Sequence, residues 1–280
     1  MRMLKSSNYL VHRFPEHSVG TSTLKVSNLG FRFGSVEALT GISFEVSVSE
    51  RLAVVGPNGA GKSTLFKIIA GVLKPTQGLV QIYGYEPKGH ICIAYVPQRN
   101  LVDWTFPVDV ADVVMMGRVS KLGPLRWPSS KDWEIVHHSL ELVEMEGFAK
   151  RQINELSGGQ QQRIFIAQAL AQEAELILMD EPLTGLDFNT QQDIFRILDL
   201  LRQKKVTVII AMHDLKLASE RFDRVILLNK RLIGIGIPEE VFVPENLSLA
   251  YGNHLRMFTT KEGMLVIEDT CCEEGDHLHA

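Results

Sequence analysis

The chain has 280 residues, 45% of them hydrophobic and 22% charged, and a net charge of -4 at pH 7. This length can bury a large core in one or two domains, and the acidic balance argues against nucleic acid as a partner, since nucleic-acid binders usually carry a basic face. No apolar run approaches the roughly 18 residues of a membrane span, and neither a signal peptide nor a disulfide framework is visible, so we expect a cytosolic protein.

Ahead of residue 100, most of the chain has the alternating pattern or the short apolar runs of β-strands. Residues 1–22 are polar and irregular and are expected to form a flexible extension. The predicted strands are 24–33, 42–48, 51–55, 79–83 and 91–96. The first two are expected to form a small antiparallel sheet, and the third leads into a glycine-rich run that an apolar helix follows.

That glycine-rich run, Gly56–Thr64, reads GPNGAGKST and matches the P-loop pattern G-x-x-x-x-G-K-[ST]. Gly59 and Gly61 lack a Cβ, so the backbone can curl around phosphate oxygens and aim its N–H groups inward. The helix that begins here adds a favourable field for an anion. Lys62 would reach the β- and γ-phosphates, and the Ser63 hydroxyl would bind Mg²⁺. We therefore predict a nucleotide-binding protein.

Between residues 101 and 151 the apolar residues recur at spacings of three and four, which favours helices. We predict helices over 108–116 and 133–145 and, because of its glycine and prolines, a loop over 121–130. We interpret this segment as a helical subdomain, at about 100–163, inserted into an α/β core.

The second half of the chain alternates strand and helix patterns. The predicted strands are 175–179, 206–211 and 224–228, and one helical face carries Ile194, Ile197, Leu198 and Leu201. Such alternation predicts parallel strands joined by helical crossovers. From about Thr260 onward we expect this order to be lost.

Two carboxylates end the buried strand that reads LILMD. Asp180 would hold Mg²⁺ through its water shell, and Glu181 is placed to orient and deprotonate an attacking water. The alternative is an acidic pair that is merely solvated at a strand end, but a P-loop upstream favours the first interpretation.

A second glycine motif, LSGGQ, covers residues 156–160. Ser157 is a natural N-cap, while Gly158 and Gly159 leave backbone N–H groups open. We interpret this motif as a second anion-binding helix end. Because the P-loop already covers one face of a nucleotide, the second site would serve a phosphate presented from elsewhere.

In this order, GPNGAGKST, LSGGQ and LILMDEP resemble the ATP-binding cassette of the ABC transporter family. Flanking residues match as well: Gln98 corresponds to the Q-loop glutamine, residues 185–187 to the D-loop, and His213 to the switch histidine. Phe33 fits the aromatic position that stacks on adenine, where the family more often has tyrosine. The resemblance covers about residues 24–255.

The resemblance implies an α/β fold, a P-loop NTPase with a RecA-like parallel sheet core, a small antiparallel β subdomain and an inserted α-helical subdomain. The ATPase domain would cover residues 23–258. The remaining residues, 259–280, would form a C-terminal tail that we expect to be flexible.

The resemblance also implies ATP and Mg²⁺ as the bound groups and assigns a role to each matching residue. The implied catalytic residues are Glu181, His213, which would contact the γ-phosphate, and Gln98, which would sense Mg²⁺. The implied nucleotide-binding residues are Phe33, Gly56, Pro57, Asn58, Gly59, Ala60, Gly61, Lys62, Ser63, Thr64, Ser157, Gly158, Gly159, Gln160 and Asp187. The implied Mg²⁺ ligands are Ser63, Gln98 and Asp180.

The family pairs two cassettes head-to-tail, so that the LSGGQ motif of one copy closes over ATP on the P-loop of the other. One cassette without a membrane segment implies that an integral membrane permease is a separate polypeptide. An extracytoplasmic substrate-binding protein would be an indirect partner, and nucleic acid would not be one. The chain would then lie peripherally on the cytoplasmic face of the cell membrane.

The segment Val96–Arg118 is most similar to the cassettes of manganese, zinc and iron uptake systems. The expected function is therefore ATP hydrolysis that powers uptake of a divalent metal ion. The same role for an iron-siderophore, haem or cobalamin importer stays open, because related cassettes share the ending Met-Gly-Arg at 116–118. A soluble ABC ATPase acting on ribosomes or DNA usually has tandem cassettes or coiled-coil insertions, and a P-loop kinase has no use for LSGGQ.

The acidic end of the chain carries Cys271, Cys272, His277 and His279. Thiolate and imidazole donors suit Zn²⁺, although the spacing is not that of a standard structural zinc site. A solvated terminus without metal is the alternative and the one that we expect.

Overall fold

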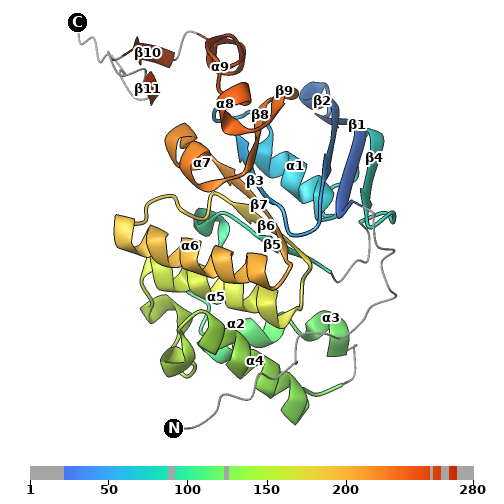
Figure 1. Ribbon diagram of the computed structural model, residues 1–280. Helices are drawn as coiled ribbons and strands as arrows, with labels where there is room; N and C mark the ends of the chain where they lie inside the picture. Colours follow the sequence, from blue (N-terminus) through green and yellow to red (C-terminus); the bar gives the residue numbers. More distant parts are fainter. Residues whose placement is uncertain (1–21, 88–91, 123–125, 253–254, 260–264, 270–280) are drawn as a thin grey trace, which may run out of the picture.

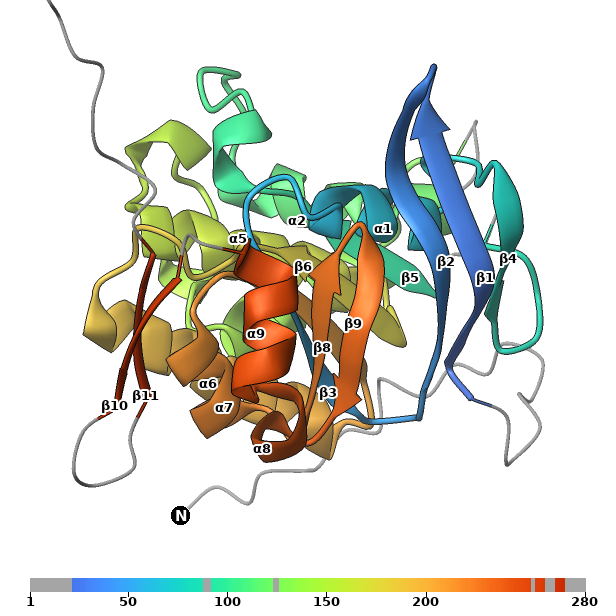
Figure 2. The same cartoon turned by 90° about the horizontal axis from the view of Figure 1, so that it is seen from above.

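The computed structural model describes residues 22–87, 92–122, 126–252, 255–259 and 265–269. Two sheets lie side by side with a layer of helices below them in the view of Figure 1, and Figure 2 shows the smaller sheet at one edge of the molecule. The predicted α/β class, with a parallel core, a small antiparallel sheet and an inserted group of helices, is confirmed.

The larger sheet has six strands in the order β5-β6-β7-β3-β8-β9. Their bounds are Arg51–Val55 for β3, Ile93–Val96 for β5, Leu176–Asp180 for β6, Thr207–Met212 for β7, Arg224–Asn229 for β8 and Arg231–Gly236 for β9. All neighbours pair in parallel except β8 and β9. Every residue of β6 and β7 is buried, as expected for parallel strands that are covered on both faces.

The smaller sheet is antiparallel, in the order β2-β1-β4. Its strands are β1 Leu24–Phe33, β2 Val36–Val46 and β4 Gln77–Ile82. The helix α1, Lys62–Ile69, lies between the two sheets (Figures 1 and 2) and buries Leu65, Phe66, Ile68 and Ile69 in a common hydrophobic cluster. This packing fixes α1, and with it the loop before it, against both sheets.

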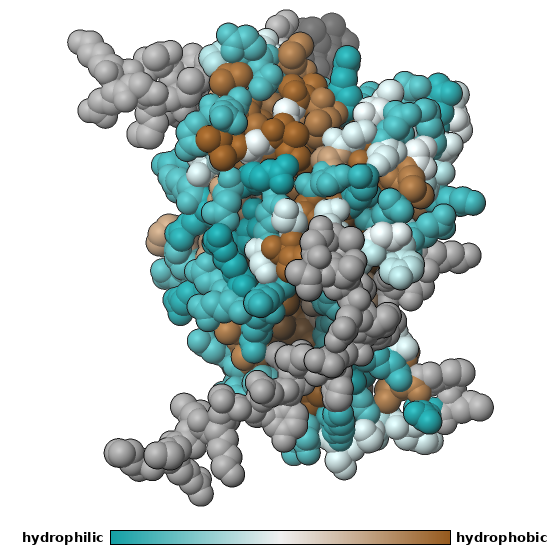
Figure 3. Space-filling model, turned by 45° about the vertical axis from the view of Figure 1, so that its right-hand side comes forward, coloured by the Kyte–Doolittle hydropathy of each residue, from teal (hydrophilic) through white to brown (hydrophobic). Residues whose placement is uncertain are grey.

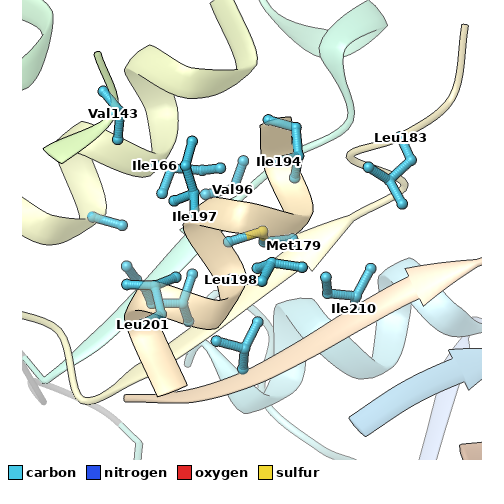
Figure 4. Close-up of a cluster of buried hydrophobic side chains, with 14 of the residues drawn as sticks. Val96, Val143, Ile166, Met179, Leu183, Ile194, Ile197, Leu198, Leu201 and Ile210 are labelled. Atoms are coloured by element: carbon cyan, nitrogen blue, oxygen red, sulfur yellow. The ribbon is translucent and has the colours of Figure 1, made fainter. Parts of the chain in front are cut away.

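The remaining helices cover the face of the large sheet that lies opposite α1. The elements that follow β5 are η1 Arg99–Leu101, α2 Val110–Met116, α3 Val119–Leu122, α4 Ser130–Leu142, η2 Glu146–Phe148, η3 Ile153–Glu155 and α5 Gly158–Ala171. The later helices are α6 Phe188–Gln203, α7 Leu215–Arg221, α8 Pro238–Val241 and α9 Pro244–Tyr251. Figure 4 shows the predicted apolar face of α6 packed on sheet residues such as Met179 and Ile210 and on Ile166 of α5.

Several boundaries differ from the sequence prediction. The helix expected over 133–145 begins at Ser130, because Ser129 and Asp132 form a capping box at its N-terminus. The second strand begins at Val36, earlier than expected. The antiparallel edge strand β9 was not predicted, since its half-buried residues do not form the continuous apolar run of its neighbours.

The expected loss of order after Thr260 is wrong for residues 265–269. They form β11, which pairs antiparallel with β10, Leu255–Thr259. A five-residue strand of this kind is stabilised by its partner strand, and no long periodic pattern in the sequence reveals it. The predicted N-terminal extension and the Cys/His cluster at 271–279 lie outside the described residues, and the division of the chain at 258 stays a prediction.

No helix in the described segments is long and apolar enough to cross a bilayer. The face of the molecule in Figure 3 is mostly hydrophilic, and hydrophobic side chains gather in its upper part.

The helical part is held together by a buried group of charges around Arg118. Its Nε donates to Asp132 Oδ1 at 3.1 Å, and its Nη1 donates to Glu173 Oε2 at 2.7 Å and to the carbonyl of Ala171 at 2.9 Å. Lys121 also pairs with Glu173. These bonds join the end of α2 to the start of α4 and to the end of α5.

Arg118→Met is expected to lower the free energy of unfolding by about 3–5 kcal/mol, because among the described residues it leaves the buried carboxylate of Asp132 without a charged partner and Glu173 with Lys121 alone. Burial opposes ionisation of Glu173, but the hydrogen bonds and charges of Lys121 and Arg118 outweigh burial and lower the pKa of Glu173. Burial likewise opposes ionisation of Asp132, and the hydrogen bonds from Ser129 and Arg118 outweigh it and lower the pKa of Asp132. The network therefore stabilises the fold fully above the unfolded carboxyl pKa of about 4, and this stabilisation is lost as the pH falls through the folded values.

Urea denaturation at pH 7 and at acid pH measures this effect. The difference in the free energy of unfolding between the wild type and Arg118→Met should shrink as the pH falls below about 4. The control Arg202→Met removes an exposed pair with Asp223, and should cost about 0–1 kcal/mol. Equal losses of unfolding free energy in Arg118→Met and Arg202→Met would contradict a stabilising role of the buried charges around Arg118.

Candidate nucleotide-binding site

The site lies at one edge of the large sheet, where three parallel strands end together. Val55 of β3 pairs with Met212 of β7, and Ala211 pairs with Asp180 of β6. Because parallel strands deliver their carboxyl ends to the same edge, the segments that follow them must meet there. Those segments are the P-loop after β3, Glu181 after β6 and His213 after β7.

The P-loop adopts the conformation that its glycines predict. Gly59 and Gly61 have φ angles of 78° and 95°, and α1 begins directly after Gly61. A Cβ on Gly56 would lie 2.0 Å from the carbonyl oxygen of Leu228, so only glycine allows this close approach to β8. Asn58 and Gly59 are exposed at the tip of the loop, where a ligand can reach their N–H groups.

Lys62 lies inside the loop that precedes it. Its side chain is only 5% exposed, and Nζ donates to the carbonyls of Gly56 at 2.6 Å and Pro57 at 3.1 Å. Glu181 Oε1 lies 3.9 Å from the same nitrogen. Burial lowers the pKa of Lys62, and the charges of Glu181 and Asp180 partly oppose this effect. The lysine thus places a buried positive charge between the loop and the carboxylates.

Asp180 is almost completely buried at the end of β6 and has one free oxygen. Oδ2 accepts a hydrogen bond from the Tyr95 hydroxyl at 3.3 Å, whereas Oδ1 has no partner in the described residues. The Ser63 hydroxyl lies near the carboxylate. Burial raises the pKa of Asp180, and the neighbouring charge of Glu181 raises it further. An unpaired buried carboxylate oxygen beside a hydroxyl is a donor set that suits a small divalent cation.

Glu181 is held in place by its backbone and by Gln98. Its φ angle is 49°, an uncommon value for a non-glycine residue, and its N–H donates to the Ala211 carbonyl at 3.0 Å. Gln98 Nε2 donates to Glu181 Oε2 at 2.5 Å. The exposed His213 lies with Glu181 on the wall of a cavity of about 140 Å³. Glu181 and His213 therefore line one cavity, and Gln98 contacts Glu181.

The LSGGQ motif forms the start of α5, as predicted. The Ser157 side chain accepts from the Gln160 N–H, and the Gln160 side chain accepts from the Ser157 N–H at 2.9 Å, which makes a capping box. A Cβ on Gly159 would lie 2.1 Å from Thr190 Cγ2 in the first turn of α6. The second glycine of the motif is thus required for packing against α6.

The predicted residues fall into two separate groups. Lys62, Ser63, Asp180, Glu181 and Gln98 come together at the sheet edge, whereas the LSGGQ loop lies on the helical part (Figure 1). In the part of the chain that the structure describes, no hydrogen bond or ion pair joins the LSGGQ loop to the P-loop.

Two other predicted residues are held locally. Phe33 is 55% exposed at the end of β1, where its ring meets Phe31 edge-on at 4.8 Å. Asp187 caps α6 by accepting from the Thr190 N–H at 3.0 Å and hydroxyl at 2.6 Å, and these bonds lower its pKa. These contacts do not connect Phe33 or Asp187 to the carboxylates of Asp180 and Glu181. Phe33 would therefore approach a nucleotide from β1, and Asp187 from the start of α6.

Sequence reasoning missed Tyr95 as the partner of Asp180. The two residues are 85 positions apart and meet only because β5 and β6 are neighbours in the sheet. The order of strands in a parallel sheet is not encoded in either segment alone, so the motif Tyr-Val-Pro-Gln gave no signal for this bond.

The chain is similar to known proteins over most of its length. The family model described as ABC transporter matches residues 39–184. The manganese transport system ATP-binding protein MntB of Halalkalibacterium halodurans is 42% identical over 246 residues, which cover 87% of this chain and 98% of that protein. The zinc transport system ATP-binding protein TroB of Treponema pallidum is 41% identical over 241 residues, which cover 86% and 91%.

Among solved structures, the ADP conformation of MJ1267, an ATP-binding cassette of an ABC transporter, aligns with a TM-score of 0.74. It is 25% identical, and the alignment covers 83% of this chain and all of that one, 100%.

Proposed function

Because this chain belongs to the ABC transporter family, we propose that it is the ATP-hydrolysing subunit of an importer and powers the uptake of a divalent metal ion through a separate permease. The observation that carries the proposal is the convergence of a P-loop lysine and two strand-end carboxylates at one sheet edge, in a chain that matches this family over half its length.

ATP would bind with its phosphates in the P-loop, where the N–H groups of residues 56–64 and the start of α1 favour an anion. Lys62 would exchange the carbonyls that it now contacts for the β- and γ-phosphates. Phe33 would stack on the adenine ring. Glu181 would hold the attacking water and accept its proton, and His213, which lines the same cavity as Glu181, would contact the γ-phosphate.

The free Oδ1 of Asp180 supports Mg²⁺ as the ion of this site. With Ser63 and Gln98, Asp180 would hold it, since hard oxygen donors suit this cation. Mg²⁺ neutralises charge on the phosphate oxygens during phosphoryl transfer. Gln98, already bonded to Glu181, is placed to connect the ion to the general base.

A second copy of the chain would complete each site. The LSGGQ loop of one copy lies apart from its own P-loop, so Ser157, Gly158, Gly159 and Gln160 would meet ATP only across a head-to-tail dimer (Figure 1). Asp187, at the start of α6 beside this loop, would lie in the same interface. Two ATP molecules would therefore be enclosed between two chains.

The remaining partners follow from the transport role. The dimer would bind an integral membrane permease and lie peripherally at the cytoplasmic face of the membrane. A substrate-binding protein on the other side would deliver the cargo and touch the permease only. Nucleic acid is not among the proposed partners, in keeping with the net charge of -4.

The cargo that we propose is manganese, with zinc or iron as the other members of this class. The relatives described above are named as manganese and zinc transport proteins, and each aligns with most of this chain. The segment 96–118, which resembles such cassettes, forms the start of the helical part. An iron-chelate or corrinoid importer is the second candidate.

Deleting the gene in its own organism and measuring cellular metals by elemental analysis tests the cargo. In metal-limited medium, manganese content should fall and should recover with an intact copy or with excess free ion. Unchanged manganese, zinc and iron in a strain without a second importer would contradict the metal assignment. Loss of growth on an iron chelate or corrinoid in that strain would then identify the second candidate.

A further inference from the structure

Two adjacent residues after β5 point to two different parts of the molecule. Gln98 donates to the carboxylate of Glu181 at the sheet edge. Arg99 instead reaches α5, where its Nε donates to Gln161 Oε1 at 2.8 Å. Gln161 is itself buried and donates to the carbonyl of Ile153 at 3.1 Å. One short segment thus connects the general base to the helix that carries the LSGGQ motif.

The contact with α5 extends along one face of the helix. A Cβ on Gly158 would lie 2.6 Å from Arg99 Nη1, so the guanidinium occupies the space beside the first glycine of the motif. Trp104 donates to the Arg99 carbonyl at 2.9 Å and packs edge-on against Phe165 at 5.4 Å. Positions 158, 161 and 165 are three and four apart and lie on one face of the helix. The segment 99–104 therefore holds the first two turns of α5.

The positive charge of Arg99 does not stabilise the fold through an ion pair within the part of the chain that the structure describes. Among the described residues no ion pair involves Arg99, and its side chain lies against neutral Gln161, Gly158 and the ring of Trp104. A cation near a helix N-terminus is electrostatically unfavourable. A planar guanidinium does, however, provide the rigid and directional link that a lysine lacks.

We propose that Arg99 is a positioning residue that ties Gln98 to the first turns of α5 in the same chain. In the paired cassettes, Gln98 faces the ATP site on its own P-loop, while the LSGGQ loop completes the site of the partner. Arg99 then couples the two sites, because a shift of Gln98 on nucleotide or ion binding must move the LSGGQ loop. The proposal rests on the paired-cassette function above.

The test uses the full-length chain with Arg99→Met, Arg99→Lys and Gln161→Met. Arg99→Met should leave the affinity for a fluorescent ATP analogue within about twofold of the wild-type value, because the P-loop is untouched. The same variant should lower kcat about tenfold or more with little change in KM, since misplacement of a catalytic element by about 1 Å costs on that scale. Arg99→Lys should recover part of the rate. Arg202→Met is the control for loss of a surface arginine and should behave as the wild type.

The double variant with Arg99→Met and Gln161→Met distinguishes positioning from a general structural role. Residues that act through one contact are not additive, so the double variant should be no slower than the slower single variant. Thermal unfolding of each variant excludes misfolding as the cause of the lower rate, and Gln161→Met breaks the same contact from the other side.

An unchanged kcat in folded Arg99→Met, or a double variant whose loss is the product of the two single losses, would overturn the proposal. Failure of the underlying function looks different: the wild-type chain would then neither hydrolyse ATP nor bind the analogue.

Discussion

Lys62→Ala is expected to weaken ATP binding by about 10²–10³-fold. A hydrogen bond to a charged group is worth about 1.5–3 kcal/mol, and Lys62 has two acceptors in place that phosphates would replace. The lysine is also the buried positive charge that offsets Asp180 and Glu181 at the site, so its loss leaves the carboxylates to repel the triphosphate.

Titration with a fluorescent ATP analogue measures this loss. Lys67→Ala, five residues further along, removes a lysine from the last turn of α1 and should bind as the wild type. If both variants bound the nucleotide equally well, the phosphates would not lie where we place them.

Glu181→Gln is expected to slow hydrolysis by about 10²–10⁴-fold while ATP binding persists, because an amide cannot accept the proton of the attacking water. The substitution preserves the shape of the side chain, and its carbonyl can still accept the hydrogen bond from Gln98. The nucleotide should therefore remain enclosed, and the dimer should accumulate with ATP and Mg²⁺.

Single-turnover hydrolysis and light scattering measure the two effects. Glu141→Gln, an exposed glutamate of α4, is the matched control and should hydrolyse ATP at the wild-type rate. A Glu181→Gln chain that stays monomeric at saturating ATP and high concentration would argue against the paired-cassette mechanism.

The features that could be predicted from sequence are those in which a single stretch determines the geometry. The P-loop glycines take up left-handed conformations, Ser157 caps α5, and Asp180 ends a buried strand, each because of residues within a few positions. The fold class follows from the same local patterns, since alternation of strand and helix allows few arrangements. Family membership and the metal-transport role were also predicted, and the comparisons agree.

Contacts between distant segments could not be predicted. Arg99 meets Gln161 across 62 positions, and Gly159 meets Thr190 through the packing of α5 on α6. Hydrophobic periodicity indicates which face of a helix is buried but not which neighbour covers it. The hairpin of β10 and β11 was missed for a related reason, because short strands depend on pairing more than on their own sequence.

Uptake of radioactive manganese is the measurement that tests the central claim most directly. Cells whose only copy of the gene carries the wild type, Glu181→Gln or Glu141→Gln are compared by initial rate, with equal amounts of each chain present in the membrane fraction. We predict that Glu141→Gln transports as the wild type and that Glu181→Gln transports at least about a hundredfold more slowly, in proportion to its lost hydrolysis. Manganese uptake at the wild-type rate in cells with the Glu181→Gln chain would contradict the claim that ATP hydrolysis at this site drives metal import.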